Sequence, residues 1–443
     1  MQDKSSSTIQ YISPQEAVSC IRSGSHIHLS SASQVPSSLL DALAERALNG
    51  SITDIHLHHS FNAGFRQLIN YEQLEGRIID QPFFVGPGTR NAIELGLADY
   101  IPVHLSETQA LYRTGILQCD VAIISVSTPR GGKAVSLGGD VVCTLGALDV
   151  AKYVIAEVNP NIPFCFGDAV IPIERIDAFV YSDRPLVETH IKDSTEVEKR
   201  IGEKCAALIP DGSCIQMGIG SLPNAIAASL YDHKHLGMHT EMFSNGLMGL
   251  IKSGVIDGTK KQIDSRQAVA SFVIGDAELF SFVNENSLVR MMDINYTNNP
   301  ANIARNDNVV AINAAVQIDL SGQICADSVG HHVISGTGGQ LDFIRGASMS
   351  RGGISIIALN STTKTGLSKI VSSLRVGAGV VTPRASVQWV VTEYGAINLY
   401  GCSMRERANM LINIAHPNYR EQLEREAFDI FGPRLKMFVK PID

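Results

Sequence analysis

Apolar runs alternate with amphipathic segments along the first half of the chain. Runs such as HIHLSSAS at 26–33 and CDVAIISVS at 119–127 predict strands, and SSLLDALAERALNG at 37–50 has the apolar spacing of a helix that ends at Gly50. A shorter capped helix is predicted at 13–24, and IPVH at 101–104 is read as a further strand. Apolar strands between helices are typical of a largely parallel sheet with helices on its faces.

The second half of the chain repeats this pattern. Periodicity is lost at 179–199, where charge and proline gather, and 194–220 then restarts a capped helix, a turn and a strand, as at 13–30. The sequence therefore predicts two related, open, largely parallel α/β domains at 1–190 and 191–443. Their interface is the natural place for the active site.

Composition narrows the class of protein. A chain of 443 residues can hold two domains, and a formal net charge of -8 argues against a nucleic-acid partner. The N-terminal segment lacks an apolar core behind a basic head, and no run reaches the length of a membrane span. We expect a cytoplasmic protein with no membrane partner.

The cysteines and histidines invite a metal-site interpretation. Eight cysteines are scattered without a CxxC pair, so we interpret them as reduced core residues. His26, His28, His56 and His58 lie two apart on their strands, but no carboxylate or thiol shares that spacing. We therefore predict no metal site and expect these histidines to line a pocket or satisfy backbone groups.

The most informative stretch begins with a glycine-rich turn. A predicted strand ends in Gly218, Ile219 and Gly220, a tight turn runs through Ser221 and Leu222, and a helix follows with Pro223 near its first position. Exposed amides at such a turn suit an anion, either a phosphate or the oxyanion of acyl transfer. A dinucleotide-binding turn is rejected because its third glycine would fall at Pro223.

Glu241 is the candidate nucleophile. Its neighbours His239, Thr240, Met242 and Phe243 predict a strand-like, poorly solvated setting. A carboxylate in such a setting needs a partner or a function, although a solvated surface glutamate is the alternative interpretation.

These motifs resemble one known family. GIGSLPNAIAASL at 218–230, HTEM at 239–242, and the segments at 336–353 and 393–423 are similar to the acetyl-CoA hydrolase/transferase family, in the branch with 4-hydroxybutyrate and butyryl-CoA:acetate CoA-transferases. The chain departs from the family at Asn245, where an aspartate is common, and in STPRGGKAVSLGG at 127–139. Both departures concern the substrate more than the chemistry.

The resemblance implies a role for each motif. Glu241 would attack the acyl-CoA thioester, and a backbone N–H near Gly339 would complete an oxyanion hole with the amide near Leu222. A flexible loop at 336–353 and a core valine at 316 remain the alternative interpretations of the later segments. The implied coenzyme A contacts are Gly218, Ile219, Gly220, Ser221, Leu222, Val316, Gly338 and Gly339.

The resemblance also implies the reaction. Coenzyme A thioester is then a substrate, no prosthetic group is needed, and the partners are acyl-CoA and small carboxylic acids, with a homodimer or larger homo-oligomer expected. Acetate with 4-hydroxybutyrate or butyrate is the expected pair. Transfer to a dicarboxylate such as itaconate or succinate, acyl-CoA hydrolysis and non-catalytic acyl-CoA binding stay open. The loops at 30–36 and 60–65 are expected to wall the acyl pocket, since ligands bind after the strands of such sheets.

Overall fold

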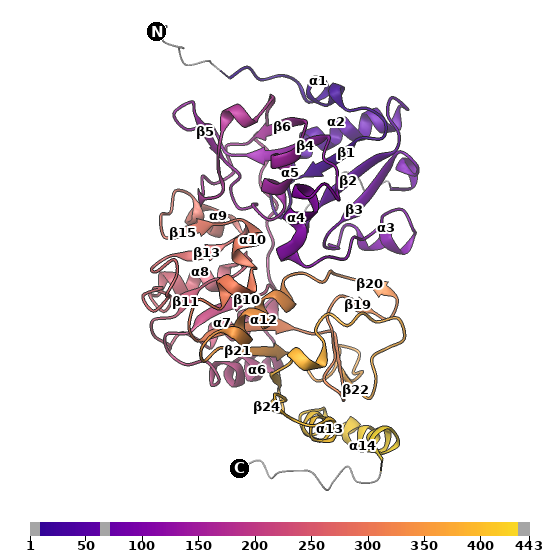
Figure 1. Ribbon diagram of the computed structural model, residues 1–443, viewed down its shortest axis with the longest axis vertical. Helices are drawn as coiled ribbons and strands as arrows, with labels where there is room; N and C mark the ends of the chain where they lie inside the picture. Colours follow the sequence, from indigo (N-terminus) through magenta and orange to yellow (C-terminus); the bar gives the residue numbers. More distant parts are fainter. Residues whose placement is uncertain (1–8, 63–70, 433–443) are drawn as a thin grey trace. The chain divides into compact units, whose positions relative to one another are not determined.

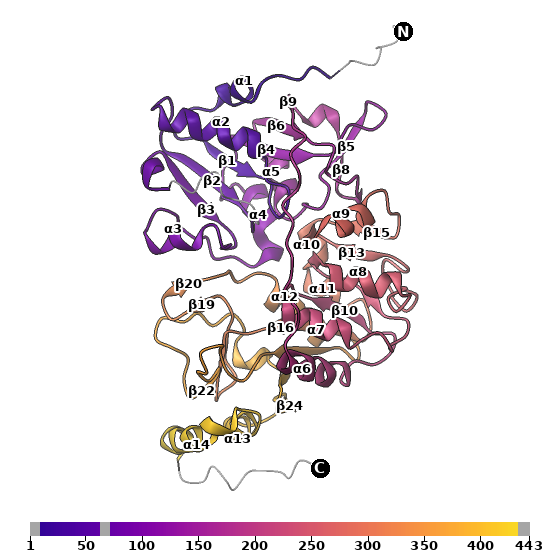
Figure 2. The same cartoon turned by 180° about the vertical axis from the view of Figure 1, so that it is seen from behind.

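The structure is a computed structural model that describes residues 9–62 and 71–432. The chain forms two compact units (Figures 1 and 2). Unit 1 comprises Met1–His190, Thr240–Asn245 and Gln267–Asn298, and unit 2 comprises Ile191–His239, Gly246–Arg266 and Asn299–Asp443. The units are thus interleaved in sequence, and a single domain boundary at 190 stays a prediction. The predicted mixed α/β class with mostly parallel sheets is confirmed.

Unit 1 is built on a six-stranded sheet in the order β3-β2-β1-β4-β6-β9, in which every pairing is parallel. The strands are β1 (His26–Leu29), β2 (Ile55–His59), β3 (Ile78–Pro82), β4 (Val121–Val126), β6 (Tyr153–Val158) and β9 (Ala178–Tyr181). Strand order reverses between β1 and β4. In doubly wound sheets, ligands bind beyond the carboxyl ends of the strands at such a point.

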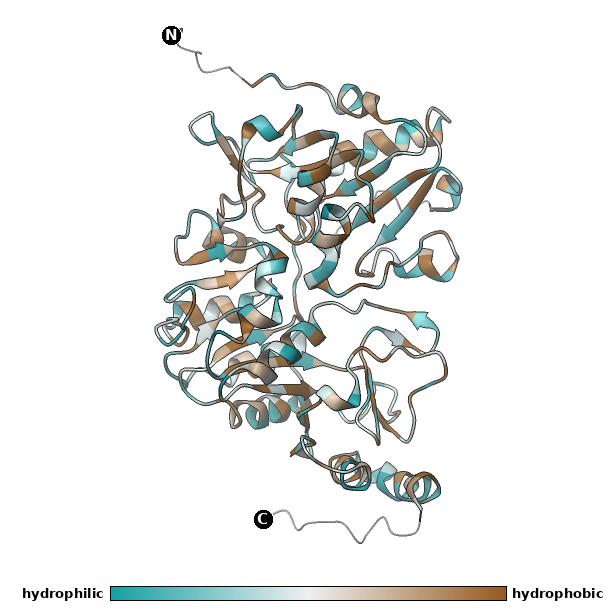
Figure 3. Ribbon diagram, viewed as in Figure 1, coloured by the Kyte–Doolittle hydropathy of each residue, from teal (hydrophilic) through white to brown (hydrophobic). Residues whose placement is uncertain are grey.

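Helices cover both faces of this sheet. On one face α2 (Ser37–Leu48) buries Leu39 and Leu43 in a core with Ile27 of β1, and α1 (Pro14–Ala17) packs beside α2. Alternate residues point the other way, where His28 meets α4 (Thr108–Arg113) and α5 (Thr144–Val150). Figure 3 shows hydrophobic stretches along the strands and mixed colouring on the helices.

Smaller elements complete unit 1. They are α3 (Arg90–Glu94), β5 (Ala134–Ser136), β7 (Phe166–Gly167), β8 (Val170–Pro172), β12 (Met242–Phe243), β13 (Ala268–Ala270), β14 (Phe272–Val273), α9 (Ala277–Val283), β15 (Val289–Met291) and α10 (Ile294–Thr297). Strand β12 pairs with β14, whereas β13 pairs with β15. The apolar run AVASFVIGD at 268–276, whose pattern predicts one strand, therefore forms two short strands, because the chain changes sheet at Ser271.

Unit 2 contains a second six-stranded sheet, in the order β11-β10-β16-β21-β23-β24, which is parallel except for the β23–β24 pair. The strands are β10 (Cys214–Met217), β11 (Gly237–Met238), β16 (Val309–Ala314), β21 (Ile354–Ala358), β23 (Trp389–Thr392) and β24 (Gly395–Asn398). Strand order reverses between β10 and β16. The two sheets therefore share a doubly wound plan with a reversal beside their first strand.

Several helices pack on this second sheet. Helix α12 (Gln340–Met349) lies against β16, β21 and α11 (Pro300–Ile303), while α6 (Glu196–Ala206) packs with α7 (Ser221–Ala228). The remaining elements are α8 (Asn245–Lys252), β17 (Gln317–Asp319), β18 (Ile324–Cys325), β19 (Ser328–Val329), β20 (His332–Val333), β22 (Ile370–Val371), α13 (Met404–Asn413) and α14 (Pro417–Phe431).

Some local predictions are corrected. The helix predicted at 13–24 is the four-residue α1 followed by a 3-10 helix at Val18–Cys20, and 101–104 contains no named strand. All eight cysteines are free, and six are buried as predicted, but Cys20 is exposed and Cys402 is half-buried. In the described part of the chain, no helix is both long and apolar enough to cross a membrane.

Candidate functional site

Glu241 lies in unit 1, immediately before β12. Its carbonyl oxygen accepts hydrogen bonds from the backbone amides of Ser271 at 2.8 Å and Phe272 at 2.9 Å, and the amide of Thr240 donates to the carbonyl of Val269 at 3.0 Å. Glu241 is half-buried, and Met242 after it is buried. Glu241 thus lies at a bend directly before β12, among the buried residues His239, Thr240, Met242 and Phe243, and its backbone is held on both sides.

The carboxylate of Glu241 is held by an amide. Asn298, fully buried after α10, donates from Nδ2 to Glu241 Oε2 at 2.7 Å. The Ser271 hydroxyl donates to Thr297 Oγ1 at 2.9 Å. Backbone and side chain of Glu241 thus connect through Ser271, Thr297 and Asn298. A neutral donor of this kind favours the charged form of a carboxylate and orients it.

Asn298 is a hydrogen-bond partner of Glu241 that the sequence did not reveal. It stands 57 residues from Glu241 in an asparagine pair before Pro300, where the local pattern indicates only a helix start. The contact depends on the tertiary fold of unit 1, so neither spacing nor residue type pointed to it.

A hydrogen bond to Asp276 accounts for the asparagine at position 245. Asn245 donates from Nδ2 to Asp276 Oδ1 at 2.7 Å, and Asp276 in turn caps α9 by accepting from the amide of Leu279 at 3.1 Å. Burial raises the pKa of Asp276, but these bonds together hold it below its ordinary value. An aspartate at position 245 would place a second carboxylate against Asp276, whereas asparagine supplies a donor.

The loop after β1 packs beside the Glu241 segment. Ala32 donates from its amide to the carbonyl of Phe61 at 2.7 Å. Ala32, Phe61, Met242, Phe272 and Ile274 form one apolar group, here called the Ala32 cluster. The loop predicted to wall the acyl pocket therefore contacts residues adjacent to Glu241. Positions 63–65 of the second predicted loop lie outside the described residues.

Asp140 holds the loop after β1 in place through a hydrogen bond with Ser31. It is fully buried, accepts from the amide of Ser31 through Oδ2, and forms a backbone bridge with Phe272. The amide of Ser60 donates to Ser31 Oγ at 3.0 Å. Burial raises the pKa of Asp140 to about 7, against the opposing effects of the Ser31 amide and of His59. The segment at 127–139, which departs from the family pattern, supports the same loop through Gln34, which accepts from the Gly139 amide at 2.6 Å and donates to the Leu137 carbonyl at 2.8 Å.

The strand histidines bond to their neighbours. His28 contacts the hydroxyls of Tyr112 at 3.2 Å and Thr144 at 3.1 Å, and His26 Nδ1 lies 3.2 Å from His58 Nε2. Burial lowers the pKa of His28 and His58 to about 3, so both rings are neutral at pH 7. The described residues contain no group of three or more His, Cys, Asp or Glu side chains able to hold a metal ion.

The glycine-rich turn lies in unit 2. Gly218 and Ile219 follow β10, Gly220 caps α7, and Ser221 and Leu222 are its first residues, so the helix starts two residues before Pro223. Gly220 has φ 128°, a backbone conformation that residues other than glycine rarely adopt. The Ser221 hydroxyl donates to Glu198 Oε1 at 2.5 Å. The turn predicted from glycine spacing is present.

The other predicted contacts lie at the same edge of this sheet. Val316, half-buried, follows β16, and Gly338 and Gly339 precede α12. Gln340 at the start of α12 donates from Nε2 to the carbonyl of Ala314 at the end of β16, at 2.9 Å. Thus 218–222, 316 and 338–339 all follow or adjoin the carboxyl ends of the two strands where the order reverses.

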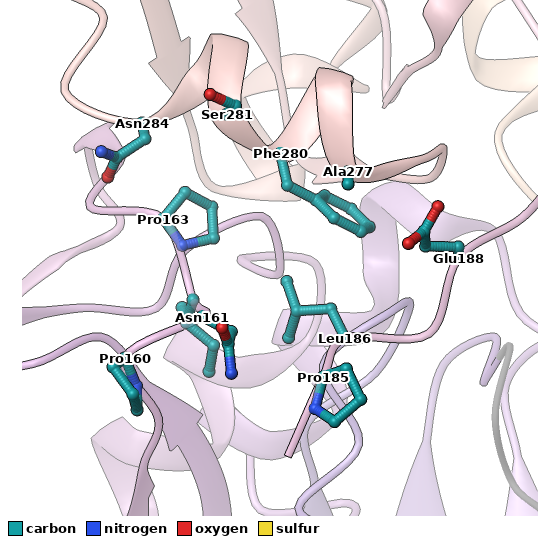
Figure 4. A pocket seen from close by; sticks show the side chains of 11 residues that line it. Pro160, Asn161, Pro163, Pro185, Leu186, Glu188, Ala277, Phe280, Ser281 and Asn284 are labelled. Atoms are coloured by element: carbon teal, nitrogen blue, oxygen red, sulfur yellow. The ribbon is translucent and has the colours of Figure 1, made fainter. Parts of the chain in front are cut away.

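A separate pocket in unit 1 has a volume of about 330 Å³. In Figure 4, the side chains of Phe280, Pro163 and Leu186 point into the same space. None of the predicted site residues lines this pocket. Its full lining is Pro160, Asn161, Ile162, Pro163, Pro185, Leu186, Glu188, Ala277, Phe280, Ser281 and Asn284.

Replacing Asp140 tests the cost of burying this carboxyl. Its pKa is about 7 in the fold and about 3.9 when unfolded, so ionisation of the unfolded chain destabilises the protein as pH rises from about 4 to 7. Asp140→Asn removes that penalty, which is at most about 1.4 kcal/mol per pKa unit. We expect the variant to gain free energy of unfolding over the wild type at pH 8, with the gain fading toward pH 4.

Denaturant unfolding at both pH values makes the measurement, and Asp41→Asn, at an exposed aspartate, is the matched control for the same change of side chain. A difference between Asp140→Asn and wild type that is equal at pH 8 and pH 4 would contradict the raised pKa.

Comparison with known proteins gives consistent matches across the chain. Residues 1–189 match the profile of the acetyl-CoA hydrolase/transferase N-terminal domain, and residues 275–427 match the C-terminal domain of the same family. The 4-hydroxybutyrate coenzyme A transferase of Clostridium kluyveri is 42% identical over 94% of this chain and 96% of its own length.

Two further relatives are a succinyl-CoA:acetate/propanoyl-CoA:succinate CoA transferase of Fasciola hepatica, 39% identical over 96% of this chain and 88% of its own, and a butyryl-CoA:acetate CoA-transferase of Anaerostipes caccae, 35% identical over 93% and 94%. The crystal structure of RipA from Yersinia pestis aligns with a TM-score of 0.90 at 36% identity, covering 95% of this chain and 98% of that one. The chain belongs to the acetyl-CoA hydrolase/transferase family.

Proposed function

We propose that this CoA-transferase exchanges coenzyme A between acetate and 4-hydroxybutyrate or butyrate, and that the Glu241 carboxylate carries coenzyme A during the exchange. The family and the full-length relatives named for these substrates support the reaction class. The observation that supports Glu241 is its setting: a half-buried carboxylate with a fixed backbone and one oxygen held by the Asn298 amide at 2.7 Å. Acyl-CoA and small carboxylic acids are then the substrates.

The exchange needs one nucleophile. A carboxylate oxygen of Glu241 attacks the thioester carbonyl of acyl-CoA, the C–S bond breaks, and CoA thiolate leaves a mixed anhydride. The thiolate then attacks the glutamyl carbonyl and releases the first acid as its carboxylate, which leaves a glutamyl-CoA thioester. The second acid repeats these steps in reverse. No net proton transfer is required.

The hydrogen bond from Asn298 Nδ2 to Oε2 of Glu241 is proposed to orient the carboxylate, whose oxygen attacks the thioester. Holding the carboxylate in one orientation lowers the entropic part of the barrier, and a misplacement of about 1 Å can cost about a hundredfold in rate. The Asn298 bond also lowers the cost of keeping the carboxylate ionised near apolar side chains.

Coenzyme A is proposed to bind the turn of Gly218, Ile219, Gly220, Ser221 and Leu222, together with Val316, Gly338 and Gly339. The common edge of these segments in unit 2 supports the proposal, as do the backbone amides that a helix start offers to an oxyanion or phosphate. Each backbone donor aimed at an oxyanion contributes about 3–4 kcal/mol to lowering the barrier.

A dicarboxylate exchange is the second candidate. The Fasciola hepatica relative is named for succinyl-CoA and propanoyl-CoA. Hydrolysis is the third, since a relative named acetyl-CoA hydrolase is 28% identical over 53% of this chain. In that case water resolves the glutamyl intermediate.

One assay separates these possibilities. Release of the starting acid and formation of the new thioester are followed with acyl-CoA, with and without acetate, butyrate, 4-hydroxybutyrate or succinate. A transferase needs the acceptor and gives parallel double-reciprocal lines, because the first acid leaves before the second binds. Acceptor-independent turnover would indicate a hydrolase, and converging lines a ternary complex.

The first variant to test is Glu241→Asp. The side chain is shorter by about 1.5 Å, so the carboxylate no longer reaches the thioester and transfer falls by at least about a hundredfold. The space left admits water, which the aspartate activates as a general base. We expect slow acyl-CoA hydrolysis that does not depend on acetate, whereas Glu241→Ala has neither reaction.

Near-normal acetate-dependent exchange by a folded Glu241→Asp protein would show that another group is the nucleophile.

Two variants at Asn298 test its positioning role. Asn298→Ala removes the bond to Glu241, and we expect kcat to fall about 10- to 100-fold with a smaller change in KM. Asn298→Asp instead sets a second carboxylate against Glu241, which raises the pKa of the pair. The acid limb of the kcat/KM profile should therefore move to higher pH.

Circular dichroism and thermal unfolding show whether both proteins are folded. An unmoved pH profile in a folded Asn298→Asp protein would contradict the proposed contact.

The glycine turn is tested with Gly220→Ala. At φ 128° a side chain strains the start of α7 and shifts its amides, so we expect kcat/KM to fall at least about tenfold. Gly254→Ala is the matched control, because Gly254 also has a positive φ, at 79°, with no atom within 4 Å of an added Cβ. It should lose stability but retain kcat/KM. Equal kinetics in the two variants would remove the turn from the site.

A further inference from the structure

Two buried polar side chains follow strands β1 and β2 without hydrogen-bond partners. Within the described residues, the Ser33 hydroxyl and both amide atoms, Nδ2 and Oδ1, of Asn62 make no hydrogen bond. Ser33 is 2% exposed and Asn62 is 3% exposed. Buried polar groups in native proteins are nearly always bonded, so a pair of this kind calls for a bound polar group.

The backbone brings these two residues together. Ala32 and Asn62 form a parallel bridge, and the amide of Ala32 donates to the carbonyl of Phe61 at 2.7 Å. Ser33 is the next residue after Ala32. Two loops that are far apart in sequence therefore place their unpartnered polar groups on adjoining backbone segments, at the carboxyl edge of the first sheet.

The same loops adjoin the proposed nucleophile. Ala32 packs in the Ala32 cluster with Met242, the residue after Glu241, and with Phe272. The Phe272 amide donates to the Glu241 carbonyl at 2.9 Å. An acyl chain attached at Glu241 and running along these apolar side chains would meet the two polar groups at its far end.

The chemistry of the pair selects a neutral group. An amide and a hydroxyl both donate and accept, as a substrate hydroxyl does. A carboxylate would have to lose its hydration, which is costly unless a cation faces it. Among the described residues of this part of unit 1, His59 could supply a charge, but its Nε2 is already 2.7 Å from Asp80 Oδ1. An alkyl chain end would leave both polar groups unsatisfied.

We infer that the Asn62 amide and the Ser33 hydroxyl bind a hydroxyl group at the far end of the acyl chain, so that the enzyme prefers hydroxyalkanoyl to unsubstituted and dicarboxylic acyl groups. This inference rests on the proposed CoA transfer at Glu241. It selects one substrate class among those named for relatives of the chain.

The test compares kcat/KM for 4-hydroxybutyryl-CoA, butyryl-CoA and succinyl-CoA, each with acetate as acceptor. Wild-type enzyme should favour 4-hydroxybutyryl-CoA over butyryl-CoA by at least about tenfold, because a site that binds a hydroxyl rejects the analogue without it. Asn62→Leu, of similar size, should lower that ratio at least about tenfold, because the 4-hydroxybutyryl group loses its partner. Ser33→Ala should lower it by a smaller factor.

Ser31→Ala is the matched control. Ser31 stands in the same loop, but its hydroxyl oxygen accepts the Ser60 amide at 3.0 Å, so its removal should change both rates in parallel and leave their ratio unchanged. If Asn62→Leu does not fold, Ser33→Ala still tests the hydroxyl site through the ratio of kcat/KM for 4-hydroxybutyryl-CoA to that for butyryl-CoA.

The outcomes separate the two levels of the proposal. Acetate-dependent exchange with an unaltered ratio in folded Asn62→Leu and Ser33→Ala proteins would overturn the hydroxyl site and leave the transferase standing, as would a wild-type preference for butyryl-CoA or succinyl-CoA. Exchange with none of the three thioesters would overturn the proposed function itself.

Discussion

The hydrogen bond between Asn298 and Glu241 is the interaction on which the proposed chemistry depends. A carboxylate that acts as a nucleophile must stay ionised and must be held in one orientation. A cation paired with it would lower its reactivity. An amide donor at 2.7 Å meets these conditions, because it orients one oxygen without cancelling the charge. The double acceptance of backbone amides by the Glu241 carbonyl fixes the other end of the residue.

The fold supplies this arrangement through two sheets of the same plan. Each has a strand order that reverses beside its first strand, where loops rather than helices follow the strand ends. In unit 1 those loops hold the Ala32 cluster, Asp140, and the Ser33 and Asn62 side chains, which have no hydrogen-bond partner among the described residues. In unit 2 they are the glycine turn and the start of α12. The residues proposed to take part in the reaction are therefore on short, tightly bonded connections, which hold side chains in fixed positions.

The sequence predicted those features of the fold that depend on residues close together along the chain. Apolar runs located strands such as β1 and β4, and glycine spacing located the turn at 218–222, since both patterns depend on neighbouring residues alone. They did not locate β23 or β24, and β9 overlaps the region at 179–199 where the sequence pattern loses its periodicity. The sequence did not predict Asn298, whose role depends on a contact across 57 residues, or the split of 268–276 at Ser271, where backbone amides turn toward Glu241. The sequence also did not predict why asparagine stands at position 245, because its bond to Asp276 joins residues 31 positions apart.

Trapping the covalent intermediate tests the central claim most directly. The enzyme is incubated with acyl-CoA alone, treated with borohydride, digested and analysed by mass spectrometry, with borohydride alone as the control. A glutamyl-CoA thioester is reduced to an alcohol, so the account predicts loss of activity and a modified peptide that carries the change at Glu241. Full retention of activity, or a modification mapped to another residue, would contradict it.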